Sequence, residues 1–388
     1  MKLILQPGDG PALVLKAINQ AKTSIEILIF RFDRSEIERA LANAVKRGVF
    51  VHALVAHANR AGEDGLRDLE MRLLAAGVNV ARTADDLIRY HGKMMIVDRR
   101  ELYLFAFNLT YLDIERSRSF GLVITNPKLV HQAIRLFEAD TKRLPYEPGY
   151  SKFVVSPINA RKELSTFIKG ATKELLIYDP MVSDPAMIRL LEERCAAGVQ
   201  VKILGRLGER RCSFTAQKLH RLRLHARAII RDRKDAFIGS QSLRETELDS
   251  RREVGVIFQD QRTVNRMAAV FQQDWDQAER AEKRVEQDEE AQAARAAKKI
   301  AKAVTKDLQP VAPVLQEVIQ EIGGDPSHFD LDPKEVEESV KAAVKEAVKE
   351  VVRDVVEEVV EQREEMGWMK LPAPDQAKLP SPANGRSK

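Results

Sequence analysis

The chain has 388 residues, too many for one ordinary domain at about 150 residues per domain, so two or three folded units are expected. Hydrophobic residues make up 44% and charged residues 31%, with 19 Gly and 16 Pro, which excludes collagen-like, low-complexity and wholly disordered proteins. Two cysteines, Cys195 and Cys212, are too few for a disulfide-stapled secreted scaffold.

The net charge of +5 favours anionic partners such as phosphate esters. Ten Lys and Arg residues fall within 206–234 against two acids, whereas 331–365 carries twelve acids against six bases, so the two blocks should lie in different domains. No apolar run approaches the roughly 18 residues of a membrane span, and the opening residues are too short for a signal peptide. We therefore expect a cytoplasmic protein, with peripheral membrane contact as an option.

An internal repeat organises the chain from its start to about position 280. At an offset of 150, matches include Ile18 with Ile168, Gly48 with Gly198 and Val51 with Val201. The offset then becomes 134, pairing His91 with His225 and Asp98 with Asp232. A constant offset over a long stretch indicates a duplication, so we expect two similar lobes, the second shortened by 16 residues between about 55 and 90.

Each repeat shows the same order of elements. A helical pattern precedes an apolar run (25–32; 175–178), a helix ends at Gly48 or Gly198, and a second strand follows (49–55; 199–204). A third pair of short strands comes next (93–97 with 101–105; 227–231 with 236–238). Alternating strands and helices predict an α/β fold of two lobes that lie face to face, each with a mostly parallel sheet covered by helices.

Beyond about residue 283 the composition shifts to Ala, Glu, Lys and Arg. Apolar residues recur every fourth position from 336 to 360, which predicts a long amphipathic helix. Its acidic face is repelled by anionic lipid, so self-association or docking is favoured over membrane anchoring. The predicted domains are a first lobe at 1–148, a second lobe at 149–282, a charged helical linker at 283–332, the amphipathic helix at 333–366 and a disordered tail at 367–388.

The two repeats carry matching polar motifs. They read His91-Gly92-Lys93 with Asp98 five residues after the Lys, and His225-Ala226-Arg227 with Asp232 at the same distance. On a strand, residues two apart share a face, so each His and its cation should point into one site. The two aspartates also suit turns that end a strand. A following strand ends in small polar residues that are placed to hydrogen-bond an anion: Asn108 in one repeat, and Ser240 and Ser242 in the other.

This pattern resembles the phospholipase D superfamily, whose mark is two copies of H-x-K-x4-D followed by G-S-x-N. The resemblance covers residues 1 to about 280. It implies that both His and both cations surround one phosphate, that one His is the nucleophile, and that no metal or other cofactor is needed. The predicted catalytic group is His91, Lys93, Asp98, His225, Arg227 and Asp232, supported by Asn108, Ser240, Ser242 and Glu253.

A histidine pair suits this chemistry. A neutral imidazole attacks phosphorus to give a phosphohistidine, while a protonated imidazole on the opposite side donates a proton to the leaving oxygen. Lys93 and Arg227 would neutralise the nonbridging oxygens. The residues alone do not order the two histidines; the resemblance makes His91 the nucleophile and His225 the general acid.

Several positions depart from the family pattern. Arg227 stands for Lys, Phe105 and Ala106 replace Gly-Ser, and Ser242 replaces Asn. Glu253 follows His225 at the spacing where the family often places an acid that orients a His, but its counterpart in the first repeat is Ser119.

We therefore predict a phosphodiesterase that hydrolyses or transfers a phosphate diester, with phospholipid favoured over nucleic acid. A metal-independent nuclease is the alternative that the basic block favours, although aromatic residues for base stacking are not interleaved with it. A phosphate-binding scaffold without turnover is the alternative that Phe105, Ala106, Ser119 and Arg227 favour.

Overall fold

The computed structural model describes residues 1–57, 64–208, 213–306, 338–339 and 342–343. Residues Met1–Ala281 form one compact unit and Glu282–Lys388 a second. Within the predicted linker, helix continues as far as Lys306. The predicted amphipathic helix at 333–366, apart from four helical residues, and the predicted tail at 367–388 lie outside the described residues. Among the described helices, none has the length and apolar character needed to cross a membrane.

The first lobe contains the elements that precede residue 143. Its strands are β1 (Lys2–Gln6), β2 (Ser24–Ile29), β3 (Phe50–Val55), β4 (Asn79–Arg82), β5 (Arg89–Tyr90), β6 (Met94–Val97), β7 (Glu101–Phe105) and β8 (Ser117–Ile124). Its helices are α1 (Ala12–Gln20), α2 (Ser35–Lys46), α3 (Asp64–Ala75), α4 (Tyr111–Glu115) and α5 (Pro127–Lys142).

The second lobe repeats this order. Its strands are β9 (Phe153–Val155), β10 (Glu174–Val182), β11 (Gln200–Leu207), β12 (Thr215–Gln217), β13 (Arg223–Leu224), β14 (Ala228–Arg231), β15 (Asp235–Gly239), β16 (Arg251–Arg252) and β17 (Val254–Phe258). Its helices are α6 (Ala160–Lys169), α7 (Pro185–Ala196), α8 (Glu245–Asp249) and α9 (Gln261–Lys306).

The repeated helices form where the sequence spacing predicts them. In α2, Ile37, Leu41 and Ala44 are buried at helical spacing, and acidic residues occupy the first turn. Gly48 and Gly198 follow α2 and α7 with φ of 86° and 85°, a left-handed conformation that glycine adopts without a steric penalty. The chain then enters β3 or β11, as the sequence predicts.

The sheets are mixed, so the expectation of mostly parallel sheets was wrong. One has the order β1-β8-β7-β6-β2-β3-β4, and the other β12-β11-β10-β14-β15-β17-β9. Pairs joined through helices, such as β2 with β3, are parallel, but β6 with β7 and β14 with β15 are antiparallel hairpins. Their tight turns contain consecutive left-handed residues, Asp98-Arg99 and Asp232-Arg233. A tight turn reverses the chain and leaves no room for a crossover helix.

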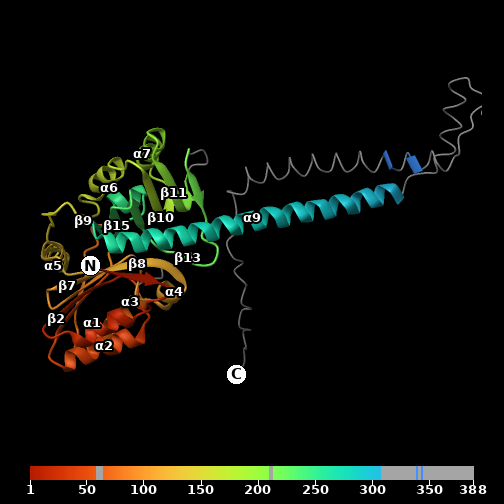
Figure 1. The fold of residues 1–388 in the computed structure, drawn as a ribbon. Helices are drawn as coiled ribbons and strands as arrows, with labels where there is room; N and C mark the ends of the chain where they lie inside the picture. The colour runs from red at the N-terminus through yellow and green to blue at the C-terminus, as the bar shows by residue number, and fades with distance from the viewer. Residues whose placement is uncertain (58–63, 209–212, 307–337, 340–341, 344–388) are drawn as a thin grey trace, which may run out of the picture. The chain divides into compact units, whose positions relative to one another are not determined.

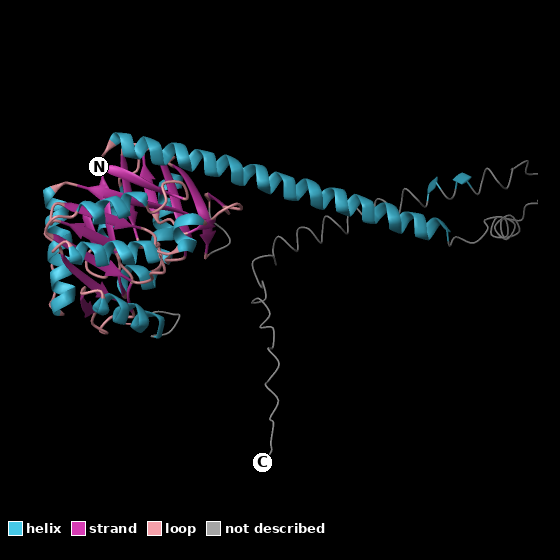
Figure 2. Cartoon of the chain, turned by 90° about the horizontal axis from the view of Figure 1, so that it is seen from below, coloured by secondary structure: helices cyan, strands magenta, loops and turns pink. Residues whose placement is uncertain are grey.

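Helices enclose the two sheets in the unit formed by Met1–Ala281 (Figure 1). One buried cluster joins α1, α2 and α3 to the outer face of the first sheet, and another joins α6 and α7 to the second sheet. The strands, drawn in magenta in Figure 2, thus lie between layers of helices.

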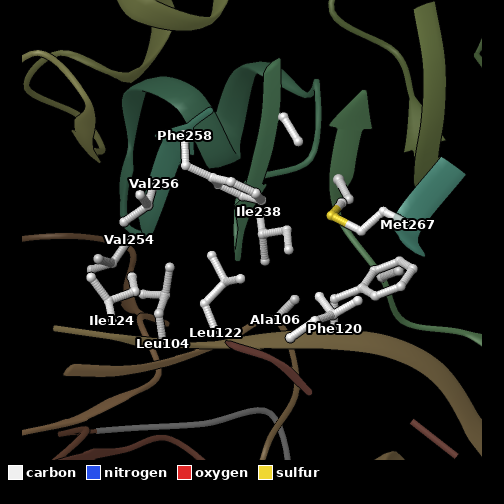
Figure 3. Packing of buried hydrophobic residues seen from close by; sticks show 14 of the residues in the cluster. Leu104, Ala106, Phe120, Leu122, Ile124, Ile238, Val254, Val256, Phe258 and Met267 are labelled. Carbon is white, nitrogen blue, oxygen red and sulfur yellow. The ribbon is translucent and has the colours of Figure 1, made fainter. Parts of the chain in front are cut away.

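A third buried cluster joins the two lobes. Figure 3 shows Leu104, Phe120 and Leu122 of the first sheet opposite Ile238 and Val256 of the second. Met267 and Phe271, from the start of α9, belong to the same cluster. The lobes therefore share one apolar core. Its close packing fixes the lobes relative to each other and so fixes the boundary at which the two motifs meet.

The difference in length between the repeats has a structural explanation. Between β3 and β5 the first lobe contains α3 and β4, whereas between β11 and β13 the described residues of the second lobe contain only β12. The shorter repeat therefore has a strand, and no described helix, at this place.

Candidate active site

Each motif histidine is held in place by the opposite lobe. Strand β5 pairs with β16, and His91 N–H donates to the carbonyl of Arg252 at 2.7 Å. Strand β13 pairs with β8, and His225 N–H donates to the carbonyl of Arg118 at 3.1 Å. Arg118 and Arg252 are themselves related by the same offset as the two histidines. The exchanged strands thus bring both motifs to the boundary between the lobes.

His91 has a carboxylate partner from the second lobe. Its Nδ1 lies 2.9 and 3.0 Å from the two oxygens of Glu253, which is fully buried. Phe30 packs edge-on against the imidazole, with ring centroids 4.5 Å apart. A carboxylate at Nδ1 favours the tautomer that keeps a proton there and leaves a lone pair on Nε2. Burial, followed by the charges of Lys93 and Arg227, lowers the pKa of His91 well below its usual value, which favours the neutral form.

His225 has a different partner, which was not among the predicted site residues. Its Nδ1 lies 3.6 Å from Asp113 Oδ2, too far for a hydrogen bond but within reach of an ion pair once the ring is protonated. Burial lowers the pKa of His225 despite the opposing charge of Asp113. The signal available in the sequence was that Asp113 and Glu247, both acids, occupy matching positions of the two repeats.

Two buried cations complete the site. Lys93 Nζ donates to the carbonyl of His91 at 2.5 Å, and burial lowers the pKa of Lys93 to about 7. Arg227 donates through Nε to Ser242 Oγ at 3.2 Å and lies 3.5 Å from Glu247. Both cations contribute to lowering the pKa of both histidines, so the two motifs form one electrostatic group.

The three small polar residues have separate environments. Asn108 donates through Nδ2 to Asp113 at 2.7 Å, and its buried Oδ1 has no hydrogen-bond partner among the described residues. Ser242 accepts from Arg227, while Ser240 Oγ accepts from the N–H of Val254 at 3.0 Å. Asn108 and Ser242 thus lie beside the ionic groups of the site, and Ser240 contacts Glu253 as well as the strand that follows it.

Asp98 and Asp232 are not part of this group, which corrects their predicted catalytic placement. Asp98 accepts hydrogen bonds from the backbone N–H groups of residues 22–24, at 2.7 to 3.1 Å. Asp232 accepts equivalent bonds from residues 172–174, at 2.7 to 3.2 Å. Both stand in left-handed turns at the far ends of β6 and β14 from the histidines. They fasten the hairpins to the sheet, as the alternative turn interpretation predicts.

The arrangement combines a nucleophile, a proton donor and an anion site. A neutral His91 held by Glu253 presents Nε2, and a protonated His225 would be balanced by Asp113. Lys93 and Arg227, both nearly fully buried, supply positive charge where water is scarce, so their attraction for a phosphate is screened little. Such a group can supply attack on phosphorus and a proton for the leaving oxygen.

The chain is similar to several known proteins. Residues 14–141 match the family described as "Cardiolipin synthase, PLD-like domain". The mitochondrial cardiolipin hydrolase of Danio rerio is 28% identical over 130 residues, covering 32% of this chain and 56% of that protein. A polyphosphate kinase of Parasynechococcus marenigrum is 25% identical over 219 residues, covering 52% of this chain and 29% of the kinase.

A solved structure shows the same fold over most of the chain. The polyphosphate kinase of Porphyromonas gingivalis superposes with a TM-score of 0.60 at 18% sequence identity, covering 70% of this chain and 46% of the kinase. The chain therefore spans about half or less of each of these relatives.

Proposed function

We infer that this chain, which belongs to the phospholipase D superfamily, hydrolyses or transfers a phosphate diester through a phosphohistidine on His91, with His225 as general acid. In the first step His91 Nε2 forms a bond to phosphorus, the bond from phosphorus to the leaving oxygen breaks, and His225 protonates that oxygen. In the second step water or an acceptor alcohol attacks phosphorus, its proton passes to His225, and the bond to His91 breaks.

The contact between His91 and Glu253 is the observation that carries this proposal. Glu253 is fully buried and faces Nδ1 with both oxygens, so it supports a ring whose Nε2 is free to attack and stabilises the positive charge that develops on attack. His225 has no hydrogen-bonded carboxylate of this kind in the described structure. The difference supports His91 as nucleophile and His225 as acid.

We propose phospholipid as the substrate. We also propose that the protein is cytoplasmic and reaches this substrate through peripheral contact with a membrane. The match to a family named for cardiolipin synthase and the likeness to a cardiolipin hydrolase support it. A second candidate is inorganic polyphosphate or another phosphoanhydride, because the match to a polyphosphate kinase covers more of this chain than the match to the cardiolipin hydrolase.

A substrate panel in EDTA tests the proposal. Wild-type protein is incubated with bis-p-nitrophenyl phosphate, then with cardiolipin vesicles, single-stranded DNA and polyphosphate, and His91→Ala serves as control. We expect turnover of the activated diester in EDTA, preference for the lipid, and loss of both in the variant. Turnover that disappears in EDTA and returns with zinc or magnesium would contradict the histidine mechanism. Cleavage of DNA alone would identify a nuclease, and no turnover of any substrate would favour a binding scaffold.

A further inference from the structure

We propose that Asp113 is the positioning residue of His225, serving as the counter-ion of its protonated ring and replacing the acid that the first repeat lacks at Ser119. The inference rests on the proposed function and deepens it, because it explains how one of two repeated histidines becomes the proton donor.

The first repeat has no acid at the place of Glu253. The residue at the matching position is Ser119, which is fully buried in β8. Its hydroxyl has no hydrogen-bond partner among the described residues, and neither has His225 Nδ1. A serine there supplies no negative charge, so His225 needs another carboxylate if it is to be protonated beside two cations.

Asp113 is oriented toward His225 by groups from both lobes. Its Oδ2 accepts from the N–H of Asn108 at 2.8 Å and from the Asn108 side chain at 2.7 Å. Its Oδ1 accepts from Arg223 of the second lobe at 2.6 Å. Oδ2 then stands 3.6 Å from His225 Nδ1, with Asp113 only 2% exposed.

The position of Asp113 favours the protonated ring, against the burial that lowers the pKa of His225. At 3.6 Å no hydrogen bond holds a neutral imidazole, whereas a charged imidazolium is attracted to a carboxylate at that distance in a buried site. Arg227, Lys93 and Arg223 also face His225, and their charges oppose its protonation. Asp113 is the anion that opposes them. Without Asp113 the pKa of His225 would be lower still, so proton donation by His225 would be lost at a lower pH.

The counterpart of Asp113 in the second lobe is used differently. Glu247 lies 3.5 Å from Arg227 and 3.1 Å from Arg251, and accepts from the N–H of Ser242 at 2.8 Å. Like Asp113, which binds Arg223, it is bound to cations, but His91 has its own hydrogen-bonded carboxylate in Glu253. The two histidines therefore have unlike partners: a hydrogen-bonded acid for His91, and an ion-pairing acid for His225.

Two variants test the assignment, Asp113→Asn and the matched control Ser119→Ala. The pH dependence of kcat/KM is measured for a diester with a phenyl leaving group and for one with a p-nitrophenyl group. For Asp113→Asn we expect a loss of roughly 10- to 100-fold on the phenyl ester, a much smaller loss on the activated ester, and a basic limb moved to lower pH. Ser119→Ala should stay within about twofold of wild type, with an unchanged pH profile. Equal losses on both esters with an unmoved basic limb would overturn the proposal.

A second measurement does not depend on turnover. In protein with nitrogen-15-labelled histidines, NMR titration follows each imidazole in the full chain. We expect Asp113→Asn to lower the titration midpoint of His225 and to leave that of His91 nearly unchanged; an unmoved His225 would overturn the assignment even if the wild type proves inactive. If Asp113→Asn melts non-cooperatively, Asp113→Glu is titrated instead, and it should keep the wild-type behaviour of His225. A lowered His225 midpoint in Asp113→Glu would count against the proposal.

Discussion

Glu253 and His91 belong to different repeats, yet a carboxylate oxygen of Glu253 lies 2.9 Å from His91 Nδ1. The contact exists because β5 pairs with β16, which draws the backbone of His91 against Arg252, the residue next to Glu253. Each motif is thus positioned by the other lobe, so we expect the chemistry of each to depend on both lobes.

Replacing the acid tests this dependence. Glu253→Gln keeps the shape of the side chain but removes its charge, so it no longer favours the reactive tautomer or stabilises the developing cation. We expect kcat to fall by roughly 10² to 10⁴, as in triads that lose their acid. Glu245→Gln, an exposed change in α8, is the control and should retain wild-type rates. A Glu253→Gln enzyme with wild-type kcat would show that His91 needs no carboxylate.

The turn aspartates should affect stability and leave chemistry intact. Asp98→Asn and Asp232→Asn weaken hydrogen bonds to three backbone N–H groups each, and we expect about 1 to 2 kcal/mol less free energy of unfolding for each variant.

The stability contributed by these aspartates should depend on pH. Burial raises the pKa of Asp98 and Asp232, but the hydrogen bonds from backbone N–H groups outweigh it and hold both pKa values below the ordinary value. Their contribution to stability is therefore present above the unfolded pKa and is lost as the pH falls through the folded pKa. Urea titrations at pH 7 and pH 3 measure it, with kcat of the folded variants as the second readout. A large loss of kcat with an unchanged free energy of unfolding would indicate that these aspartates have a catalytic role.

Phosphate binding should take up protons. Burial lowers the pKa of Lys93 to about 7, so at pH 8 much of the ligand-free site holds a neutral lysine. A bound anion favours the charged form and raises that pKa again. Calorimetric titration with inorganic phosphate at pH 8, in two buffers of different ionisation enthalpy, should show net proton uptake. Lys93→Met should reduce this uptake, and proton release by the wild type at pH 8 would contradict this account.

The first unit should fold without the second. The buried residues at the start of α9, Val264, Met267, Phe271, Trp275 and Ala278, all precede Ala281. A chain ending at Ala281 keeps them and should melt cooperatively with activity intact, whereas one ending at Asp260 exposes their partners in the core and should aggregate. Circular dichroism and size-exclusion chromatography distinguish the outcomes. Aggregation of both chains would show that the later residues belong to the catalytic fold.

The repeat made much of the fold predictable. Equal offsets placed corresponding strands and glycines in both lobes because a duplicated chain repeats its local signals. Parallel pairing was overestimated because the strand that follows each motif begins after a short hairpin turn, whose left-handed Asp98 and Arg99 give no periodic signal.

The site was predictable only in part. Matched spacing predicted His91, Lys93, His225 and Arg227, and the distance to His225 predicted Glu253. The structure brings these side chains together, and their catalytic roles stay predictions. Asp113 was missed because its contact with His225 arises from the long-range pairing of β13 with β8 of the other lobe, although Glu247 at the matching position of the second repeat was a signal.

Mapping the covalent intermediate tests the central claim most directly. His225→Ala is mixed with a p-nitrophenyl diester, which does not need the acid to leave, then quenched in alkali and digested for mass spectrometry. We predict a phosphorus adduct on the peptide containing His91, a burst of p-nitrophenol close to one per site, and no adduct in His91→Ala. An adduct on His225 in the wild type, or turnover by His91→Ala at the wild-type rate, would contradict the account.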